Sequence, residues 1–112
     1  MKKIEAFVRH EQIGSVKEAL LQIGHRSMIN YDIWYRGTEK EINQNETRGN
    51  PLYDFMPKVK LELVVDDASV PDILDAICKS AHTGYTGDSK IFVLPVEEAI
   101  RIQTKESGDM IL

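Results

Sequence analysis

The sequence predicts an α+β fold, in which a four-stranded antiparallel sheet carries two helices on one of its faces. Several short segments alternate apolar and polar residues, which is the two-residue period of a β-strand. Two longer segments place apolar residues three and four positions apart, as amphipathic helices do. These segments follow one another as strand–helix–strand, twice over. This order is that of the split βαβ, or ferredoxin-like, fold (βαββαβ).

The first half contains a strand, a helix and a second strand. Residues 4–8 alternate in the strand pattern. Ser15 and Glu18 have the spacing of a capping box, so they predict the start of the helix. Gly24 supplies a left-handed helix end, and residues 28–35 predict an alternating strand rich in aromatic and β-branched residues. The helix is expected to bury one apolar face, made of Val16, Ala19, Leu20 and Ile23.

The second half repeats this order. Residues 59–65 predict the third strand, and Ser69 predicts the N-cap of a helix with a proline in its first turn. Gly84 lies beyond the end of that helix, and residues 91–96 predict the fourth strand. A short C-terminal strand and tail are expected over residues 101–112. The apolar face of the second helix is expected to consist of Val70, Ile73, Leu74 and Ile77.

The composition indicates a single domain spanning residues 1–112, of which 42% are hydrophobic and 29% charged. The net charge of −4 disfavours nucleic acid as a partner. The longest apolar run, residues 91–96, is too short to span a membrane, and the N-terminus lacks the apolar core of a signal peptide. We therefore expect a cytoplasmic protein without direct membrane insertion. Cys78, the only cysteine, is expected to be a small core residue of the second helix.

A glycine-spaced loop, residues 83–90, carries the first candidate chemistry. Gly84 and Gly87 permit positive φ, so successive backbone N–H groups can point into one concave nest. Lys90 ends the loop, and Arg101 lies on the predicted strand that follows. Backbone donors with an ammonium and a guanidinium suit a polyphosphate. The alternative is an ordinary helix-to-strand turn with a solvated lysine; a Walker motif is excluded, because no Gly-Lys-Ser/Thr follows.

A second candidate is the long polar segment of residues 36–57 between the two halves. A loop of this length inside a small domain is usually functional or disordered, and a tolerated surface insertion is the alternative. Trp34 and Tyr35, just before it, could stack on an adenine or on a partner surface, or simply cover the sheet edge. The three histidines show no metal-ligand spacing, and no nucleophile–base pair is evident, so no enzyme is expected.

The C-terminal third resembles a signature of the PII signal-transduction proteins, TGxxGDGKIFVxPVExAIRIRTGE. The chain has TGYTGDSKIFVLPVEEAIRIQTKE, with Ser89 and Lys105 in place of glycines and Gln103 in place of an arginine. The segments MKKIEAFVR, VKEALLQIG and YDFMPKVKLELVV also resemble the family, and the register holds without a gap. The chain is therefore identified as a divergent member of the PII family.

The resemblance implies a homotrimer whose sheets face a threefold axis, with ATP or ADP bound in each cleft between neighbouring subunits. Lys90 and Arg101 would add positive charge beside the phosphates. Ser89 would be tolerated in the cradle provided that its φ is negative. The residues implied at the nucleotide are Gly37 and Thr38 beside the phosphates, the backbone of Gly87, Asp88, Ser89 and Lys90 around them, and Glu62 and Val64 on the nucleoside side.

The segment 36–57 corresponds to the T-loop, through which the family docks onto target proteins, and its start departs from the common pattern GFGRQKG. Thr38 replaces the phosphate-facing arginine, and whether Arg36 substitutes for it stays open. Glu39 replaces the glutamine that helps to bind metal and 2-oxoglutarate, so it is a doubtful ligand for Mg²⁺ beside ATP. Lys58 is retained, and the family uses it for 2-oxoglutarate or for an internal salt bridge.

These features predict a PII-like regulator that binds ATP or ADP and acts on a target protein through its T-loop, with a weak or absent response to 2-oxoglutarate. The target is unknown; a membrane transporter, a metabolic enzyme and a transcription factor are all target types in this family. A slow ATPase that resets the T-loop and a purely structural ferredoxin-like trimer are the alternatives. The ATP-versus-ADP preference and any covalent modification of the T-loop stay open.

Overall fold

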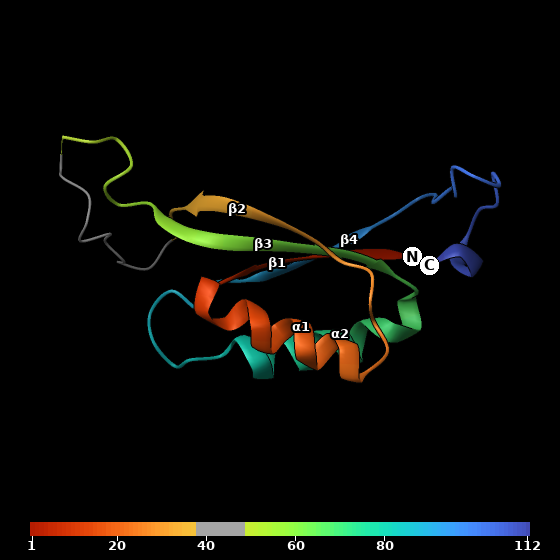
Figure 1. Ribbon diagram of the computed structural model, residues 1–112, viewed down its shortest axis with the longest axis horizontal. Helices are drawn as coiled ribbons and strands as arrows, with labels where there is room; N and C mark the ends of the chain where they lie inside the picture. Colours follow the sequence, from red (N-terminus) through yellow and green to blue (C-terminus); the bar gives the residue numbers. More distant parts are fainter. Residues whose placement is uncertain (38–48) are drawn as a thin grey trace.

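The structure is a computed structural model that describes residues 1–37 and 49–112 (Figure 1). Its long elements are the strands and helices β1 (Lys2–Val8), α1 (Ile13–Gln22), β2 (Ile29–Tyr35), β3 (Met56–Val65), α2 (Val70–Ala81) and β4 (Ile91–Pro95). Short 3₁₀ turns precede each helix and lie near the C-terminus, at His10–Gln12, Asp67–Ser69 and Asp109–Ile111.

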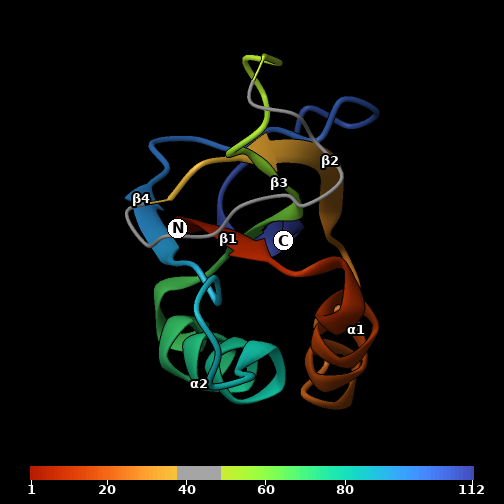
Figure 2. The ribbon, with the colours of Figure 1, turned by 90° about the vertical axis from the view of Figure 1, so that its left-hand side faces the viewer.

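The four strands form one antiparallel sheet in the order β2-β3-β1-β4, and the first and third strands are its centre. Figures 1 and 2 show both helices on one face of this sheet and none on the other. The predicted ferredoxin-like fold is therefore confirmed. The end of the sheet that carries the segment after β2 also carries the α2–β4 loop, whereas both chain termini lie at the opposite end (Figure 1).

The hydrophobic core lies between the sheet and the two helices. Alternate residues of the central strands point into it, because successive side chains of a strand face opposite sides. The helices contribute the residues of their predicted apolar faces. The buried members are Ile4, Ala6 and Val8 of β1, Val59, Leu61, Leu63 and Val65 of β3, Val16 and Leu20 of α1, and Ile73, Ile77 and Ala81 of α2.

The helix-free face carries a compact network of four charged side chains. Glu5 and Glu62 lie directly opposite each other on β1 and β3, a pairing that is repulsive without counter-charges. The Lys60 ammonium lies 3.0 Å from Glu62 and 3.6 Å from Glu5, and the Lys3 ammonium lies 3.4 and 3.3 Å from the same two carboxylates. Hydrogen bonds from Lys60 and then Lys3 lower the pKa of Glu62 against the effect of burial.

The first predicted helix start differs from the structure, whereas the second is confirmed in position, although its serine makes no capping hydrogen bond. The first helix begins at Ile13, directly after a 3₁₀ turn, so Ser15 lies inside its first turn and no capping box forms. Gln12 is the N-cap residue, and its side-chain amide donates to the Ser80 carbonyl of α2 at 3.1 Å. Ser69 does precede α2, but its hydroxyl donates to the Asp66 carboxylate at 2.6 Å instead of capping a backbone N–H.

Cys78 was expected in the core and is exposed. The buried stripe of α2 follows Ile73, Ile77 and Ala81, which are four residues apart. Cys78 is the residue after Ile77 and lies about 100° further around the helix, so its thiol faces away from the centre of that stripe.

The predicted C-terminal strand over residues 101–112 is also absent. Residues 100–107 fold back on themselves, with a single bridge between Ile100 and Ser107 and a hydrogen bond from Arg101 N–H to the Glu106 carbonyl at 2.8 Å. This segment extends beyond the end of the sheet (Figure 1), where no strand is available to pair with it. No helix within residues 1–37 and 49–112 is long and apolar enough to cross a membrane.

Candidate functional site

The predicted phosphate-cradling loop, residues 83–90, connects α2 to β4 and is anchored to both central strands. Its last residue is held by β1, because the Phe7 N–H donates to the Lys90 carbonyl at 3.2 Å. The Lys58 ammonium of β3 donates to the Gly87 carbonyl at 2.8 Å. Residues that are distant in the sequence therefore hold the loop at the end of the sheet from which the T-loop leaves.

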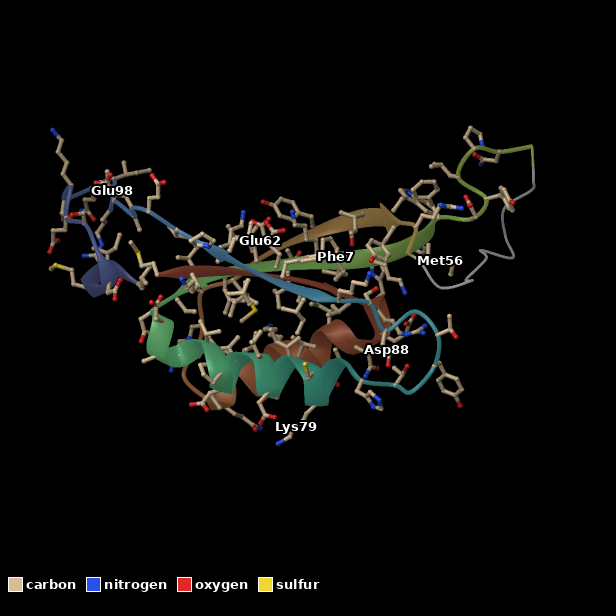
Figure 3. All side chains as sticks on the ribbon, turned by 180° about the vertical axis from the view of Figure 1, so that it is seen from behind. Phe7, Met56, Glu62, Lys79, Asp88 and Glu98 are labelled. Carbon is tan, nitrogen blue, oxygen red and sulfur yellow. The ribbon has the colours of Figure 1, made fainter. Side chains whose placement is uncertain are left out.

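The carboxylate of Asp88 organises the loop from inside (Figure 3). It accepts hydrogen bonds from the Thr83 N–H at 2.9 Å, the Gly84 N–H at 3.0 Å and the Thr83 hydroxyl. The Arg9 guanidinium donates to it at 3.2 Å and also donates to the Thr86 carbonyl. Partial burial would raise the pKa of Asp88, but these hydrogen bonds outweigh burial and hold the pKa well below the usual range of an aspartate.

The backbone on the other side of Asp88 forms a nest of donors. Gly84, Gly87 and Ser89 have φ of +83°, +101° and +71°, so left-handed residues alternate with others along the loop. Such alternation turns successive N–H groups toward one side. The N–H groups of Asp88, Ser89 and Lys90 have no acceptor among the residues that the structure describes, which suits them to bind an anion.

The resemblance allowed Ser89 in the phosphate cradle only with a negative φ, but the φ of Ser89 is positive. It stands where the PII pattern has a glycine, and so does Lys105, whose φ is +61°. These are the only non-glycine residues with positive φ in the described part of the chain. Both residues therefore have a left-handed backbone conformation that favours glycine, and a side chain there is sterically unfavourable.

We expect Ser89→Gly to stabilise the protein. Relief of the left-handed serine is worth about 1–2 kcal/mol, and the larger entropy of a glycine in the unfolded chain offsets about 0.5–1 kcal/mol of it. The free energy of unfolding, measured by urea denaturation, should rise by about 0.5–1 kcal/mol. Ser80→Gly, in the last turn of α2, is the control and should destabilise, because it removes the hydrogen bond from the Ser80 hydroxyl to the Ala76 carbonyl at 2.7 Å. A Ser89→Gly protein that is less stable than the parent would show that the serine is not strained.

Lys58 is almost completely buried, with 2% of its surface exposed. Its position near the start of β3 and its hydrogen bond to Gly87 connect the base of the T-loop to the phosphate-cradling loop. A buried ammonium needs such partners, since its desolvation is costly. The hydrogen bond to the Gly87 carbonyl differs from both roles that the resemblance implied for Lys58, 2-oxoglutarate binding and an internal salt bridge, which stay predictions.

An aromatic cluster lies beside this loop on the helix-free face. The Phe7 and Tyr35 rings stack with centroids 5.3 Å apart, and Phe92 meets Phe7 edge-on at 5.9 Å. Gly37 lies against the Tyr35 ring, where a Cβ would approach a ring carbon to 3.0 Å. Tyr35 thus packs within the chain, whereas Trp34 remains 48% exposed.

The other predicted nucleotide residues lie elsewhere in the chain. Glu62 and Val64 lie on the helix-free face of β3, with Glu62 opposite Glu5 near the middle of the sheet and Val64 nearer the end that carries the termini. A cavity of about 260 Å³ beside them is also lined by Ile29 and Leu112. Arg101 lies in the C-terminal turn and is ion-paired with Glu106 at 3.4 Å. The predicted nucleotide residues of one chain therefore fall into two separate groups, one at the 83–90 loop and one made of Glu62, Val64 and Arg101.

Two predicted residues, Thr38 and Glu39, lie outside the described residues, so neither phosphate contact nor metal binding can be located on them. Within residues 1–37 and 49–112, no three His, Cys, Asp or Glu side chains are placed to hold a metal ion.

Two contacts near the 83–90 loop were not predicted from the sequence. The first is the Arg9–Asp88 pair, whose members are 79 positions apart. The second is an ion pair between Arg36, just after β2, and Asp54, just before β3. The approach of the β2 and β3 ends, where Tyr35 pairs with Met56, is the only signal that could have indicated the second contact.

The chain is similar to known proteins along nearly its whole length. A family model described as "Nitrogen regulatory protein P-II" matches residues 1–106. The chain is 44% identical over 108 residues to a nitrogen regulatory protein P-II of Rhodospirillum rubrum and 42% identical over 108 residues to one of Azospirillum brasilense; each alignment covers 96% of both chains. The crystal structure of Arabidopsis thaliana PII bound to citrate superimposes with a TM-score of 0.79 at 37% identity, covering 97% of this chain and 86% of that one. The sequence-based identification is confirmed, and the chain belongs to the nitrogen regulatory protein P-II family.

Proposed function

We propose that this protein is a trimeric signalling protein that binds ATP or ADP between subunits and regulates a target protein through its T-loop. PII proteins are signalling proteins that bind these nucleotides, and the proposal applies that activity to this chain. The observation that carries it is the division of the predicted nucleotide residues into two half-sites, one at the 83–90 loop and one made of Glu62, Val64 and Arg101. A neighbouring copy is needed to bring the two halves together.

The two half-sites have complementary chemistry. The loop of one subunit offers the N–H nest of residues 88–90 and the exposed ammonium of Lys90, which suit the phosphates. The neighbouring subunit would offer Glu62 and Val64 to the nucleoside and Arg101 to the phosphates. The pairing of Arg101 with Glu106 is exposed, with side-chain exposures of 46% and 41%, so the guanidinium can be redirected at little cost.

The T-loop would report which nucleotide is bound. Lys58, at the base of the T-loop in β3, donates a hydrogen bond to the Gly87 carbonyl. A phosphate that moves the 83–90 loop would therefore also act on β3, the strand that follows the T-loop. Regulation requires that ATP and ADP favour different T-loop conformations, since a ligand with equal affinity for both shifts neither. The target is a protein whose identity has to be found by capture.

Calorimetric titration with ATP, ADP and AMP tests the proposal. We expect saturable binding of ATP and ADP with one site per chain, and weaker binding of AMP because it lacks the outer phosphates. A structural trimer would give no heat of binding. A slow continuing heat after ATP addition would identify the ATPase alternative.

We further expect little or no binding of 2-oxoglutarate. Glu39 places a carboxylate where the family has a neutral glutamine, and two like charges about 4 Å apart repel by roughly 4 kcal/mol at an effective dielectric constant near 20. Even if Mg²⁺ cancels half of this, affinity falls by about thirtyfold. Lys58 is also engaged with the Gly87 carbonyl. Titration of 2-oxoglutarate with saturating Mg-ATP is the measurement.

The control is Glu39→Gln, which should restore 2-oxoglutarate binding if the charge is the cause. Tight binding by the unmodified protein would contradict the expectation without affecting the proposed nucleotide site, because the ATP titration is independent of it.

A further inference from the structure

Among the residues that the structure describes, four lysines and arginines lie near the end of the sheet that carries the phosphate-cradling loop. Two of them hold the fold together: Arg9 binds Asp88 and the Thr86 carbonyl, and the buried Lys58 binds the Gly87 carbonyl. The other two of these four, Lys90 and Arg36, are exposed. A triphosphate carries several negative charges, so Lys90 and the Arg101 proposed above would leave part of that charge unbalanced.

A chain of two contacts connects the neighbour of Arg36 to this loop. That neighbour, Tyr35, stacks on Phe7 with ring centroids 5.3 Å apart. The Phe7 N–H in turn donates to the Lys90 carbonyl at 3.2 Å. Direct contacts therefore link the end of β2 to the end of the phosphate-cradling loop, and Arg36 is the next residue along the chain.

The guanidinium of Arg36 is held by one carboxylate. Its Nε donates to Asp54 at 2.5 Å, and the hydrogen bond with Asp54 raises the pKa of Arg36. The Arg36 side chain is nevertheless 62% exposed, and that of Asp54 is 25% exposed. Exposed ion pairs of this kind contribute little stability, so a ligand with more charge can displace the carboxylate.

We propose that Arg36 is a second phosphate-binding residue of this protein, and that Asp54 competes with the nucleotide polyphosphate for its guanidinium. The proposal rests on the proposed nucleotide site and adds a residue to it. An arginine can bind two phosphate oxygens through its planar fork, which the single Nε contact to Asp54 does not use. The contribution of Arg36 to binding affinity should grow with the number of phosphates in the nucleotide and be smallest for AMP.

The test is calorimetric measurement of ATP, ADP and AMP affinity for the full chain and three variants. Arg36→Gln should weaken ATP binding by about tenfold, because it removes a charge-assisted contact, and should change AMP affinity by less than about twofold. Asp54→Asn should tighten ATP binding by about two- to fivefold, because the nucleotide no longer has to break the exposed Arg36–Asp54 ion pair. In the double variant, Asp54→Asn should have no further effect, since the residue for which it competes is gone.

The chain offers a matched control in the ion pair Asp75–Lys79, which lies on the outer side of α2 with 3.0 Å between charged atoms (Figure 3). Lys79→Gln and Asp75→Asn change the net charge by the same amounts and should leave all three affinities unchanged. If Arg36→Gln binds ATP as tightly as Lys79→Gln does, the inference is wrong and the nucleotide site stands. If the unmodified protein does not bind ATP, the proposed function fails and the inference fails with it.

Discussion

Replacement of Lys90 by alanine should weaken ATP binding by about ten- to a hundredfold. Lys90 ends the N–H nest, its side chain is exposed, and its carbonyl is fixed by the Phe7 N–H, so the substitution removes a charge without removing a backbone contact. A charge-assisted contact to phosphate is worth roughly 1.5–3 kcal/mol, which corresponds to this loss of affinity. Calorimetric titration with ATP measures it.

Lys79→Ala is the control for the lost positive charge, because Lys79 lies on the outer side of α2 (Figure 3). Size-exclusion chromatography should show the same oligomeric state for both variants. Unchanged ATP affinity in an intact Lys90→Ala assembly would mean that the phosphates do not lie at this loop.

Replacement of Asp88 by asparagine should have the largest effect on the fold of the site. The carboxylate accepts from two backbone N–H groups, from the Thr83 hydroxyl and from Arg9, and an amide cannot accept from all of them. Hydrogen bonds to a charged acceptor contribute about 1.5–3 kcal/mol each but are not additive within a network. We expect a loss of about 2–4 kcal/mol in the free energy of unfolding, together with weaker ATP binding.

The pH dependence of this difference identifies the carboxylate as the cause. The pKa of Asp88 is lowered in the folded protein, so its contribution is fully present above the unfolded pKa of about 3.9 and is lost as the pH falls toward the folded pKa. In urea unfolding, the gap between the parent protein and Asp88→Asn should stay constant from neutral pH to about pH 5 and narrow below about pH 4. A gap that stays constant down to pH 3 would assign the loss to packing.

Asp32→Asn is the control for this series. Asp32 is 86% exposed beside His10, and removal of its charge should change stability little at any pH.

The strands and helices were predictable because each depends on a local period in the sequence. The four strand predictions match the structure to within three residues at each end, and the apolar faces of both helices supply much of the core. The two helix starts were predicted unequally: Ser69 is the residue before α2, as predicted, whereas α1 begins at Ile13, two residues before Ser15. The 3₁₀ turn over His10–Gln12 sets this earlier start of α1.

The glycine-rich loop shows where sequence reasoning was incomplete. Gly84 and Gly87 predicted positive φ correctly, since glycine is the residue that adopts it at no steric cost. The family resemblance made tolerance of Ser89 conditional on a negative φ, and the structure has a positive one. Contacts around the loop, made by Asp88, Lys58 and the end of β1, hold the loop backbone in this conformation.

By itself the sequence determined the fold class and the PII family and predicted the position of a phosphate-cradling loop, because these follow from local periodicity and from a contiguous motif. Only the tertiary structure decided that Asp88 faces inward to Arg9, that Lys58 holds Gly87, and that Arg36 is paired with Asp54. It also decided that the predicted nucleotide residues fall into two separate groups within one chain. Such contacts join residues 18 to 79 positions apart, and no local pattern encodes them, since they depend on which strand ends meet when the sheet forms.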